Sequence, residues 1–196
     1  MYKNVIKRII DLALSFLGVI ILLPVFIIVS VLIYIDDPGP VFFKQKRIGK
    51  NKKIFWLHKF RSMKMNTPDI PTHLLDNPEQ YITRVGRVLR LLSIDELPQI
   101  YDILLGRMSI IGPRPALWNQ NDLITERDKY GANDIKPGLT GWAQINGRDE
   151  LPIDIKAKFD GEYTEKLNTG GFTAFTMDLK CFFGTITKVL KHEGVV

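Results

Sequence analysis

The chain opens with a long apolar run. Residues 12–35, LALSFLGVIILLPVFIIVSVLIYI, carry no charged side chain over 24 positions. A helix of a soluble domain normally keeps a polar face, whereas about 20 apolar residues in a row are long enough to cross a bilayer. The run is too long for a signal peptide, and no small-residue cleavage site follows it. The pattern predicts a helix that enters a membrane and stays there.

Two features bear on how this helix sits in the membrane. Pro24 lies at its middle, where it removes a backbone hydrogen bond and kinks the helix. Basic residues flank both ends, at Lys3, Lys7, Arg8, Lys44, Lys46, Arg47, Lys50, Lys52 and Lys53. The positive-inside rule keeps both flanks in the cytoplasm, and each arm of about 12 residues rises only ~18 Å. A re-entrant helix meets these conditions, but the residues alone leave a kinked spanning helix open.

Beyond the apolar run, shorter patterns predict a mixed domain. The cluster 36–40 is a turn that ends the membrane segment. The β-prone runs 41–43 and 54–57, separated by residues 47–53, predict a hairpin. Apolar spacing predicts helices over 81–92, 97–105 and near 179–190, and Gly106 closes the second. Residues 66–78, 112–115 and 136–147 are predicted to be loops, and no internal repeat or linker is visible.

The predicted helices over 81–92 and near 179–190 are amphipathic, with Lys or Arg opposite an apolar stripe. Packing on a core explains such a stripe in most domains. A helix lying in the headgroup plane shows the same pattern. Because a membrane segment is already present, we expect at least one of the two at the membrane interface.

Composition and charge narrow the class of protein. The 196 residues suit one domain, and with 45% hydrophobic residues the chain is neither disordered nor low in complexity. Residues 1–65 carry 12 Lys and Arg against 3 Asp and Glu, while the rest carry 15 against 18. This asymmetry differs from the overall basicity of a nucleic-acid coat protein. A single cysteine, Cys181, excludes a disulfide framework and a Cys-rich zinc site, and it favours a reducing compartment.

Established catalytic motifs are absent from the sequence. There is no P-loop, no dinucleotide-binding glycine motif, no G-x-S-x-G and no H-E-x-x-H. The three histidines are scattered, at His58, His73 and His192, and give no support to a histidine metal centre. The candidate chemistry therefore lies in carboxylates and guanidinium groups within Gly- and Pro-rich turns.

The pair Asp95-Glu96 is the first candidate. Pro98 is tolerated only in the first turn of a helix, so we expect Asp95 as the N-cap and Glu96 just inside. Ordinary helix capping explains such a pair on its own. However, the preceding predicted helix carries a row of cations, Arg84, Arg87 and Arg90. A helix N-terminus suits phosphate oxygens, and adjacent carboxylates suit Mg²⁺.

Two further segments combine rigid turns with polar side chains. Arg114 lies between Pro113 and Pro115, which stiffen its backbone and favour a fixed phosphate clamp. Residues 136–148 combine three glycines with side chains suited to a nucleotide or sugar, unless the segment is only a well-packed loop; these are Trp142, Gln144, Asn146 and Arg148. Lys59 and Arg61 come directly after the second β-run. They are either phosphate ligands or ordinary basic residues at the base of the hairpin.

Five of these motifs together resemble those of the bacterial sugar transferases, the monotopic phosphoglycosyl transferases. They stand in the same order and spacing, at 38–49, 59–63, 93–99, 106–115 and 137–148. The resemblance runs from the membrane segment to the C-terminal amphipathic helix, and the short chain is similar to the minimal form of the family. Some members carry Ser-Pro in the membrane helix where this chain has Leu23-Pro24.

The resemblance implies both a fold and a topology. It implies a predominantly helical α+β protein with a re-entrant membrane helix, a short β-hairpin and interfacial amphipathic helices around one compact cytoplasmic domain. Residues 1–37 would form the anchor and residues 38–196 the catalytic domain. The protein would be monotopic, on the cytoplasmic face of the bacterial plasma membrane, in the inner leaflet.

The resemblance also implies an activity. Members move a sugar 1-phosphate from a UDP-sugar to polyprenyl (undecaprenyl) phosphate, which gives polyprenyl-diphospho-sugar and UMP in the first membrane step of glycan or glycoconjugate assembly. The adjacent acidic pair is catalytic in the family and matches Asp95-Glu96. The implied partners are the two substrates and the membrane, with downstream glycosyltransferases as further partners and no nucleic acid. The sequence does not determine which sugar is transferred.

For the mechanism, we expect Asp95 to attack the β-phosphate and form a covalent phosphosugar intermediate in a ping-pong reaction. Mg²⁺ on Asp95 and Glu96 would help neutralise the transferring group, together with a set of cations, Lys59, Arg90, Arg114 and Arg148. These cations and the helix N-terminus should lower the pKa of Asp95. Two alternatives stay open: a ternary complex in which the pair only holds Mg²⁺, and a non-catalytic membrane adaptor.

Overall fold

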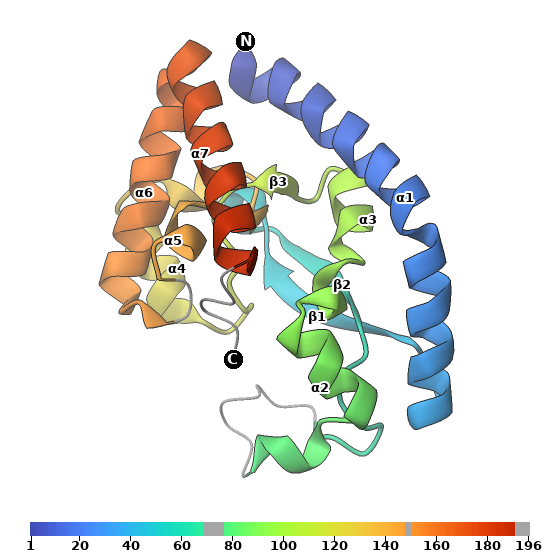
Figure 1. Ribbon diagram of the computed structural model, residues 1–196. Helices are drawn as coiled ribbons and strands as arrows, with labels where there is room; N and C mark the ends of the chain where they lie inside the picture. Colours follow the sequence, from blue (N-terminus) through green and yellow to red (C-terminus); the bar gives the residue numbers. More distant parts are fainter. Residues whose placement is uncertain (69–76, 148–149, 191–196) are drawn as a thin grey trace.

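The computed structural model describes residues 1–68, 77–147 and 150–190. Figure 1 shows a long N-terminal helix along one side of a mostly helical domain, with two small sheets between the helices. The prediction of a predominantly helical α+β chain with a hairpin is confirmed.

The N-terminal helix α1, Lys7–Asp36, continues the short π-helical turn η1, Tyr2–Ile6. It remains helical through Pro24 and arcs along the domain (Figure 1). The segment Tyr2–Asp36 is long and apolar enough to cross a membrane, and most of its side chains are exposed. Its exposed face is therefore suited to lipid, as predicted for the apolar run.

Polar side chains dock the first turns of α1 on the domain. Lys7, Asp11 and Ser15 are buried on one face of the helix, at the spacing of successive turns. Asp11 accepts hydrogen bonds from Ser109 Oγ (3.1 Å) and from the backbone N–H of Ile110 (3.0 Å). The predicted anchor is thus also an integral part of the folded domain.

The predicted hairpin is present and longer than expected. Strands β1 (Phe42–Ile48) and β2 (Ile54–Phe60) pair antiparallel, with the turn η2 (Lys50–Lys52) between them. Because successive side chains of a strand point to opposite faces, Leu57 and Lys59 share one face of β2. That face carries part of the site described below.

A second, parallel sheet was not predicted. Strands β3 (Ser109–Ile111) and β4 (Gly138–Thr140) pair side by side, and the short helix α5 (Trp142–Ile145) follows. The prediction of a plain loop over 136–147 was therefore wrong. A Cβ on Gly138 would lie only 2.1 Å from the backbone nitrogen of Gly112. Glycine allows this close approach, and the same residue type had suggested a loop in the sequence.

The two helices near the acidic pair are shorter than predicted. Helix α2 is Arg84–Leu91, and Thr83 caps it by accepting from the backbone N–H of Gly86 (2.9 Å). The residues before it form the 3-10 turn η4, Pro78–Tyr81, so the predicted start at residue 81 was wrong. Helix α3 is Gln99–Leu104, two residues shorter than predicted at its start.

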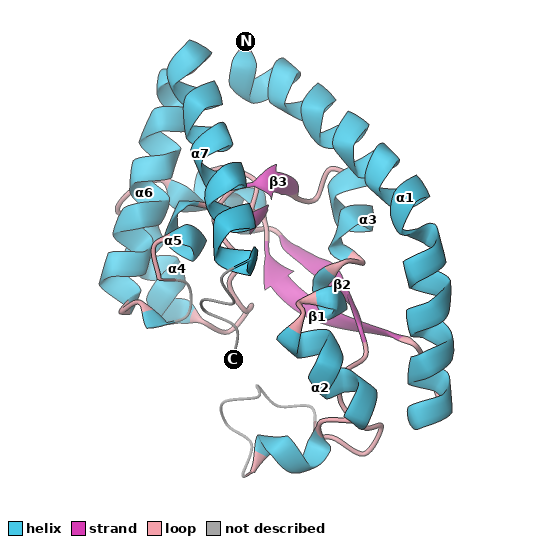
Figure 2. Ribbon diagram, in the orientation of Figure 1, coloured by secondary structure: helices cyan, strands magenta, loops and turns pink. Residues whose placement is uncertain are grey.

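Further helices complete the domain around the two sheets (Figure 2). They are α4 (Asn121–Asp128), the 3-10 turn η6 (Ala132–Asp134), α6 (Ile153–Thr169) and α7 (Gly171–Leu190). The amphipathic C-terminal helix was predicted, whereas α4 and α6 were not. The buried face of α6 includes the polar residues Asp160 and Thr164, so no apolar stripe marks it in the sequence. Most of the predicted loop 66–78 lies outside the described residues.

Candidate active site

Asp95 and Glu96 lie in a 3-10 turn, η5 (Ile94–Glu96), between α2 and α3. Ser93 begins this turn in the left-handed region, with φ of 54°. The N-cap position of α3 is held by Pro98 and has no side-chain cap. The prediction that Asp95 caps α3 was therefore wrong, because the chain makes an extra turn first and leaves the Asp95 carboxylate free of a capping role.

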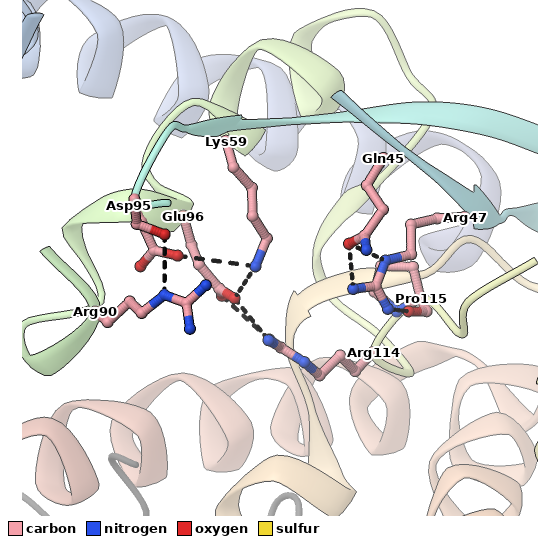
Figure 3. Close-up of polar contacts among 9 residues, drawn as sticks. Gln45, Arg47, Lys59, Arg90, Asp95, Glu96, Arg114 and Pro115 are labelled. Atoms are coloured by element: carbon pink, nitrogen blue, oxygen red, sulfur yellow. Dashed lines mark hydrogen bonds and ion pairs between the residues drawn. The ribbon is translucent and has the colours of Figure 1, made fainter. Parts of the chain in front are cut away.

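Glu96 is surrounded by cations from two distant parts of the chain (Figure 3). Arg114 donates two hydrogen bonds to its carboxylate, from Nη1 (3.1 Å) and Nη2 (2.6 Å). Lys59 donates a third from Nζ, at 2.8 Å. The fork predicted for Arg114 is thus present, but in this structure it clamps a carboxylate of the protein.

Asp95 is buried, with 8% of its surface exposed, and is held more loosely than Glu96. Lys59 Nζ forms an ion pair with Asp95 Oδ2 at 3.9 Å, a distance too long for a hydrogen bond. Arg90 points to the same region, and its Nε donates to Ser62 Oγ at 2.9 Å. Asp95 therefore retains oxygen lone pairs that an incoming group can use.

The pKa of Asp95 is raised from its ordinary value. Burial is the largest cause; the charge of Lys59 opposes it, and the neighbouring Glu96 carboxylate adds to it. The prediction that the cations and a helix N-terminus lower this pKa is therefore wrong. The loss of hydration outweighs the cations here, and Asp95 does not occupy the helix N-terminus assumed.

Glu96 behaves in the opposite way. Burial acts to raise its pKa, but the charges and hydrogen bonds of Arg114 and Lys59 outweigh burial and hold the pKa well below the usual range. The pKa values of two adjacent carboxyl groups are thus shifted in opposite directions, which is a common sign of separate roles in one site. Glu96 is the permanent anion that fixes two cations, and Asp95 is the less engaged carboxyl group.

A small pocket opens beside the pair. It is lined by three cationic side chains, the Glu96 carboxylate and neutral residues, namely Arg47, Leu57, Lys59, Glu96, Gln99, Arg114 and Pro115. Arg47 donates to the backbone oxygen of Pro115 (3.0 Å) and to Gln45 Oε1 (2.7 Å from Nη2), as Figure 3 shows. Arg47 was predicted only as one of the basic residues that flank the apolar run, so its place in this pocket was not predicted. A pocket with this lining suits the phosphates of a substrate.

Close backbone packing brings these parts together. A Cβ on Gly86 would lie 2.0 Å from the backbone oxygen of Ser62, so only glycine lets α2 approach the chain just after β2 this closely. This approach places Arg90 of α2 beside Asp95. On the side of the site formed by Arg114, the backbone N–H of Gly112 donates to the backbone oxygen of Thr140 (2.8 Å). This hydrogen bond fixes the start of the loop that carries Arg114.

The predicted nucleotide or sugar residues lie on or next to α5, which packs against α6 and α7. Trp142 donates from Nε1 to Glu162 Oε2 (2.9 Å), and the Asn146 amide donates to the backbone oxygen of Trp142 (2.8 Å). Both polar atoms of the Gln144 side chain are buried without a hydrogen-bond partner among the described residues. Arg148 lies outside the described residues. The role of this group in substrate binding stays a prediction.

The acidic pair is also the candidate for a metal ion. In residues 1–68, 77–147 and 150–190, no three His, Cys, Asp or Glu side chains converge on one point. Mg²⁺ usually takes one or two carboxylates, with substrate phosphates and water completing its shell. Asp95 accepts no hydrogen bond from the described residues, whereas both Glu96 oxygens accept from Arg114 or Lys59, so Asp95 is the member of the pair with oxygen atoms open to an ion.

Comparison with known proteins gives a consistent result. A family model described as "Bacterial sugar transferase" matches residues 2–192. The chain is 37% identical over 191 residues to the uncharacterized sugar transferase EpsL of Bacillus subtilis, covering 97% of this chain and 90% of that protein.

Two longer relatives carry more specific names. The chain is 35% identical to the UDP-glucose:undecaprenyl-phosphate glucose-1-phosphate transferase of Escherichia coli, covering 95% of this chain and 40% of the relative. It is 33% identical to the UDP-N-acetylgalactosamine-undecaprenyl-phosphate N-acetylgalactosaminephosphotransferase of Aeromonas hydrophila, covering 96% of this chain and 44% of that relative. The chain thus spans nearly all of EpsL and less than half of these two proteins.

Proposed function

The chain belongs to the bacterial sugar transferase family, and from this we propose that it transfers a sugar 1-phosphate from a UDP-sugar to polyprenyl phosphate. The products are polyprenyl-diphospho-sugar and UMP, in the first membrane step of glycan assembly. The observation that carries the proposal is the loosely held Asp95 beside a pocket of cations that Glu96 keeps in place. The names of the two longer relatives support the same pair of substrates.

In the first half-reaction, an Asp95 oxygen attacks the β-phosphorus of the UDP-sugar. A carboxylate–phosphorus bond forms, the bond from that phosphorus to the bridging oxygen breaks, and UMP leaves with the bridging oxygen and its electron pair. In the second half-reaction, an oxygen of the polyprenyl phosphate attacks the same phosphorus and expels the Asp95 carboxylate. The overall reaction exchanges one phosphate anhydride for another of similar energy, and the mixed carboxylic–phosphoric anhydride on Asp95 links the two half-reactions.

The basic side chains of the pocket supply the electrostatic stabilisation that such a transfer requires. Lys59 and Arg114 contact the phosphoryl oxygens, and Glu96 holds both of them in position before the substrate arrives. Arg90 and Arg47 approach from α2 and β1, and Arg148 completes the proposed set. Asp95 and Glu96 would hold Mg²⁺, which would supply further charge neutralisation for the phosphates.

The contacts at the two ends of α1 support a monotopic topology. Near its start, Arg8 donates to the backbone oxygens of Ile103 (2.6 Å) and Leu104 (2.8 Å). At its end, Asp36 accepts from the backbone N–H of Val85 (2.8 Å). Both partners belong to one folded domain, so a helix that placed its ends on opposite sides of a bilayer would lose one set. We propose that α1 enters and leaves the cytoplasmic leaflet.

The placement of the amphipathic helices follows from the same topology. Large apolar side chains are exposed on α2, at Val88 and Leu91, and on α7, at Phe172 and Phe183. Basic residues on both helices suit anionic headgroups. We propose that these faces rest on the membrane, close to the lipid substrate and to the downstream glycosyltransferases that use the product.

The direct test measures UMP release from a panel of UDP-sugars, with and without polyprenyl phosphate. We expect sustained release to require both substrates and to select one sugar, with no more than one UMP per enzyme molecule when the acceptor is absent. If folded protein bound to vesicles releases no UMP with any sugar, the result contradicts the proposed transferase activity and supports the non-catalytic membrane adaptor.

A second measurement separates the covalent route from a ternary complex. If Asp95 is phosphorylated, radiolabelled UMP will exchange into UDP-sugar without acceptor, and the peptide containing Asp95 will gain the mass of a sugar phosphate. Exchange that requires the acceptor supports the ternary complex, in which the acidic pair holds Mg²⁺ and the lipid phosphate attacks directly.

A further inference from the structure

Asp102 of α3 is a fully buried carboxylate outside the site described above. Its oxygens accept from the backbone N–H of His58 (2.9 Å), from His58 Nδ1 (3.0 Å) and from Arg107 Nη1 (3.2 Å). A carboxylate only accepts hydrogen bonds, so His58 carries its proton on Nδ1. Burying a carboxylate is unfavourable unless such partners compensate it. Asp102 thus ties α3 to β2 through both the backbone and the side chain of His58.

The neighbour of His58 on β2 is Lys59, the cation that bridges the acidic pair. Side chains of adjacent strand residues point to opposite faces, so fixing the backbone and ring of His58 also sets where Lys59 points. Lys59 Nζ then lies 2.8 Å from Glu96 Oε1 and 3.9 Å from Asp95 Oδ2.

The other end of the connection is α3 itself. Glu96 lies three residues before the first residue of α3, and Asp102 lies within that helix. Two contacts therefore hold β2 against the same stretch of chain, Asp102 with His58 and Glu96 with Lys59. The first is shielded from water, whereas the second lies beside the pocket that a substrate enters.

We propose that Asp102 and His58 are positioning residues, which hold β2 so that Lys59 reaches the reacting phosphoryl group at Asp95. The proposal rests on the function proposed above. In a reaction that depends on position, a displacement of about 1 Å can cost ~10²-fold in rate. Arg107 neutralises Asp102 from the solvent side, since its side chain is 40% exposed.

A double-mutant cycle tests this proposal. Asp102→Asn keeps the size of the side chain and one acceptor oxygen but loses the charge. We expect it to lower kcat of the folded enzyme by about 10- to 100-fold. In a Lys59→Gln background, the same change should lower kcat by less than about 2-fold, because the residue on which it acts is already gone.

Asp160→Asn provides the matched control. Asp160 is also buried on a helix and paired with an arginine, Arg127, at 2.6 Å. If it only stabilises the fold, its effect on kcat should be the same factor with and without Lys59. The same independence for Asp102→Asn would overturn the proposal and make Asp102 a structural residue.

A measurement that needs no turnover keeps the proposal separate from the proposed function. The Lys59 side chain is 16% exposed, whereas those of Lys52 and Lys129 are 52% and 61% exposed. In Asp102→Asn, we expect an amine-reactive reagent to modify Lys59 several-fold faster relative to these two lysines, as read by mass spectrometry. Unchanged modification of Lys59 would refute the positioning role even if the enzyme is active.

His58→Phe is the second variant, for the case in which Asp102→Asn does not fold. It removes Nδ1 but keeps the backbone hydrogen bond to Asp102 and an aromatic ring beside Tyr101, whose ring centroid lies 5.3 Å away. We expect a smaller loss of kcat than for Asp102→Asn, again confined to enzyme that contains Lys59. A loss of equal size in both backgrounds would count against the proposal.

Discussion

At the scale of single residues, Asp95 and Glu96 show how one turn produces two carboxyl groups of different character. They are adjacent, with Asp95 buried and Glu96 half-buried, but Arg114 and Lys59 bond to Glu96 and leave Asp95 with a longer ion pair. Burial therefore dominates at Asp95 and raises its pKa, whereas the cations dominate at Glu96 and lower it. The less engaged group, Asp95, is the one that we propose as the nucleophile.

Asp95→Asn should abolish transfer, with a loss of about 10³-fold or more, because an amide cannot form the acyl phosphate. The same change should not destabilise the fold. The raised pKa means that the folded state favours the neutral carboxyl group, so above the ordinary pKa an ionised Asp95 lowers stability and a neutral amide avoids this loss. UMP release and thermal unfolding measure the two effects. Wild-type turnover by this variant contradicts the nucleophile role.

The pH dependence of the reaction follows from the same shift. In the proposed mechanism Asp95 must be ionised to attack, and its folded-state pKa lies above the ordinary value of 3.8. We expect the acid limb of kcat/KM, which reports the free enzyme, to fall at a higher pH than an ordinary aspartate would give. An acid limb at or below the ordinary value would contradict the burial argument.

Arg114→Lys should lower kcat by at least about 10-fold although the charge is kept. The two hydrogen bonds from Arg114 to Glu96 need the planar fork of a guanidinium, which lysine cannot reproduce. The measurement is steady-state UMP release, with circular dichroism to verify the fold. If lysine supports wild-type turnover, Arg114 serves only as a point charge.

At the scale of the elements, α1 combines two environments in one helix. Most of its surface is apolar and exposed, whereas Lys7, Asp11 and Ser15 form a buried polar stripe along its first turns. The stripe aligns the helix on β3 and α7, and the exposed remainder is left for lipid. This arrangement explains how a membrane anchor also positions the domain that carries the site.

Thiol labelling can test the topology of α1. Cys181 is buried, so single cysteines in a Cys181→Ser background report one position each. Asn4→Cys and Lys53→Cys, both exposed, lie before and after the helix. We expect an impermeant reagent to reach both in inverted membrane vesicles and neither in intact cells. Labelling of Asn4→Cys from the outside alone would establish a spanning helix.

At the scale of the whole molecule, Asp178 joins the two ends of the chain. Its carboxylate accepts from Lys7 Nζ (2.7 Å), Tyr2 Oη (2.6 Å) and Tyr163 Oη (2.7 Å), and all four residues are buried. These partners come from η1, α1 and α6, and Asp178 itself lies on α7. A single carboxylate therefore fixes the anchor to the C-terminal helices.

Asp178→Ala should destabilise the protein by about 3–5 kcal/mol, because it leaves Lys7 buried without a counter-charge. Glu79→Ala is the matched control, since its ion pair with Arg87 is exposed and should be worth about 0–1 kcal/mol. Chemical unfolding in detergent measures both. Equal effects of the two substitutions would mean that the buried pair contributes no more than a surface pair.

The sequence by itself determined the features that depend on neighbouring residues. The uncharged apolar run predicts a membrane segment at residues 12–35, and two β-prone runs around a turn predict the hairpin. Pro113 and Pro115 mark Arg114 as a rigid cation, and the acidic pair is adjacent in the chain. Such features are local in sequence, so their physical cause is visible without the fold.

Only the tertiary structure decided how these parts act on one another. Glu96 is 18 residues from Arg114 and 37 from Lys59, so no local pattern reports that they meet. Arg47 joins the pocket only because β1 passes the loop of Pro115. The direction of the Asp95 pKa shift was likewise beyond the sequence, because it depends on burial and on distances to charges, and both arise only when separate segments pack together.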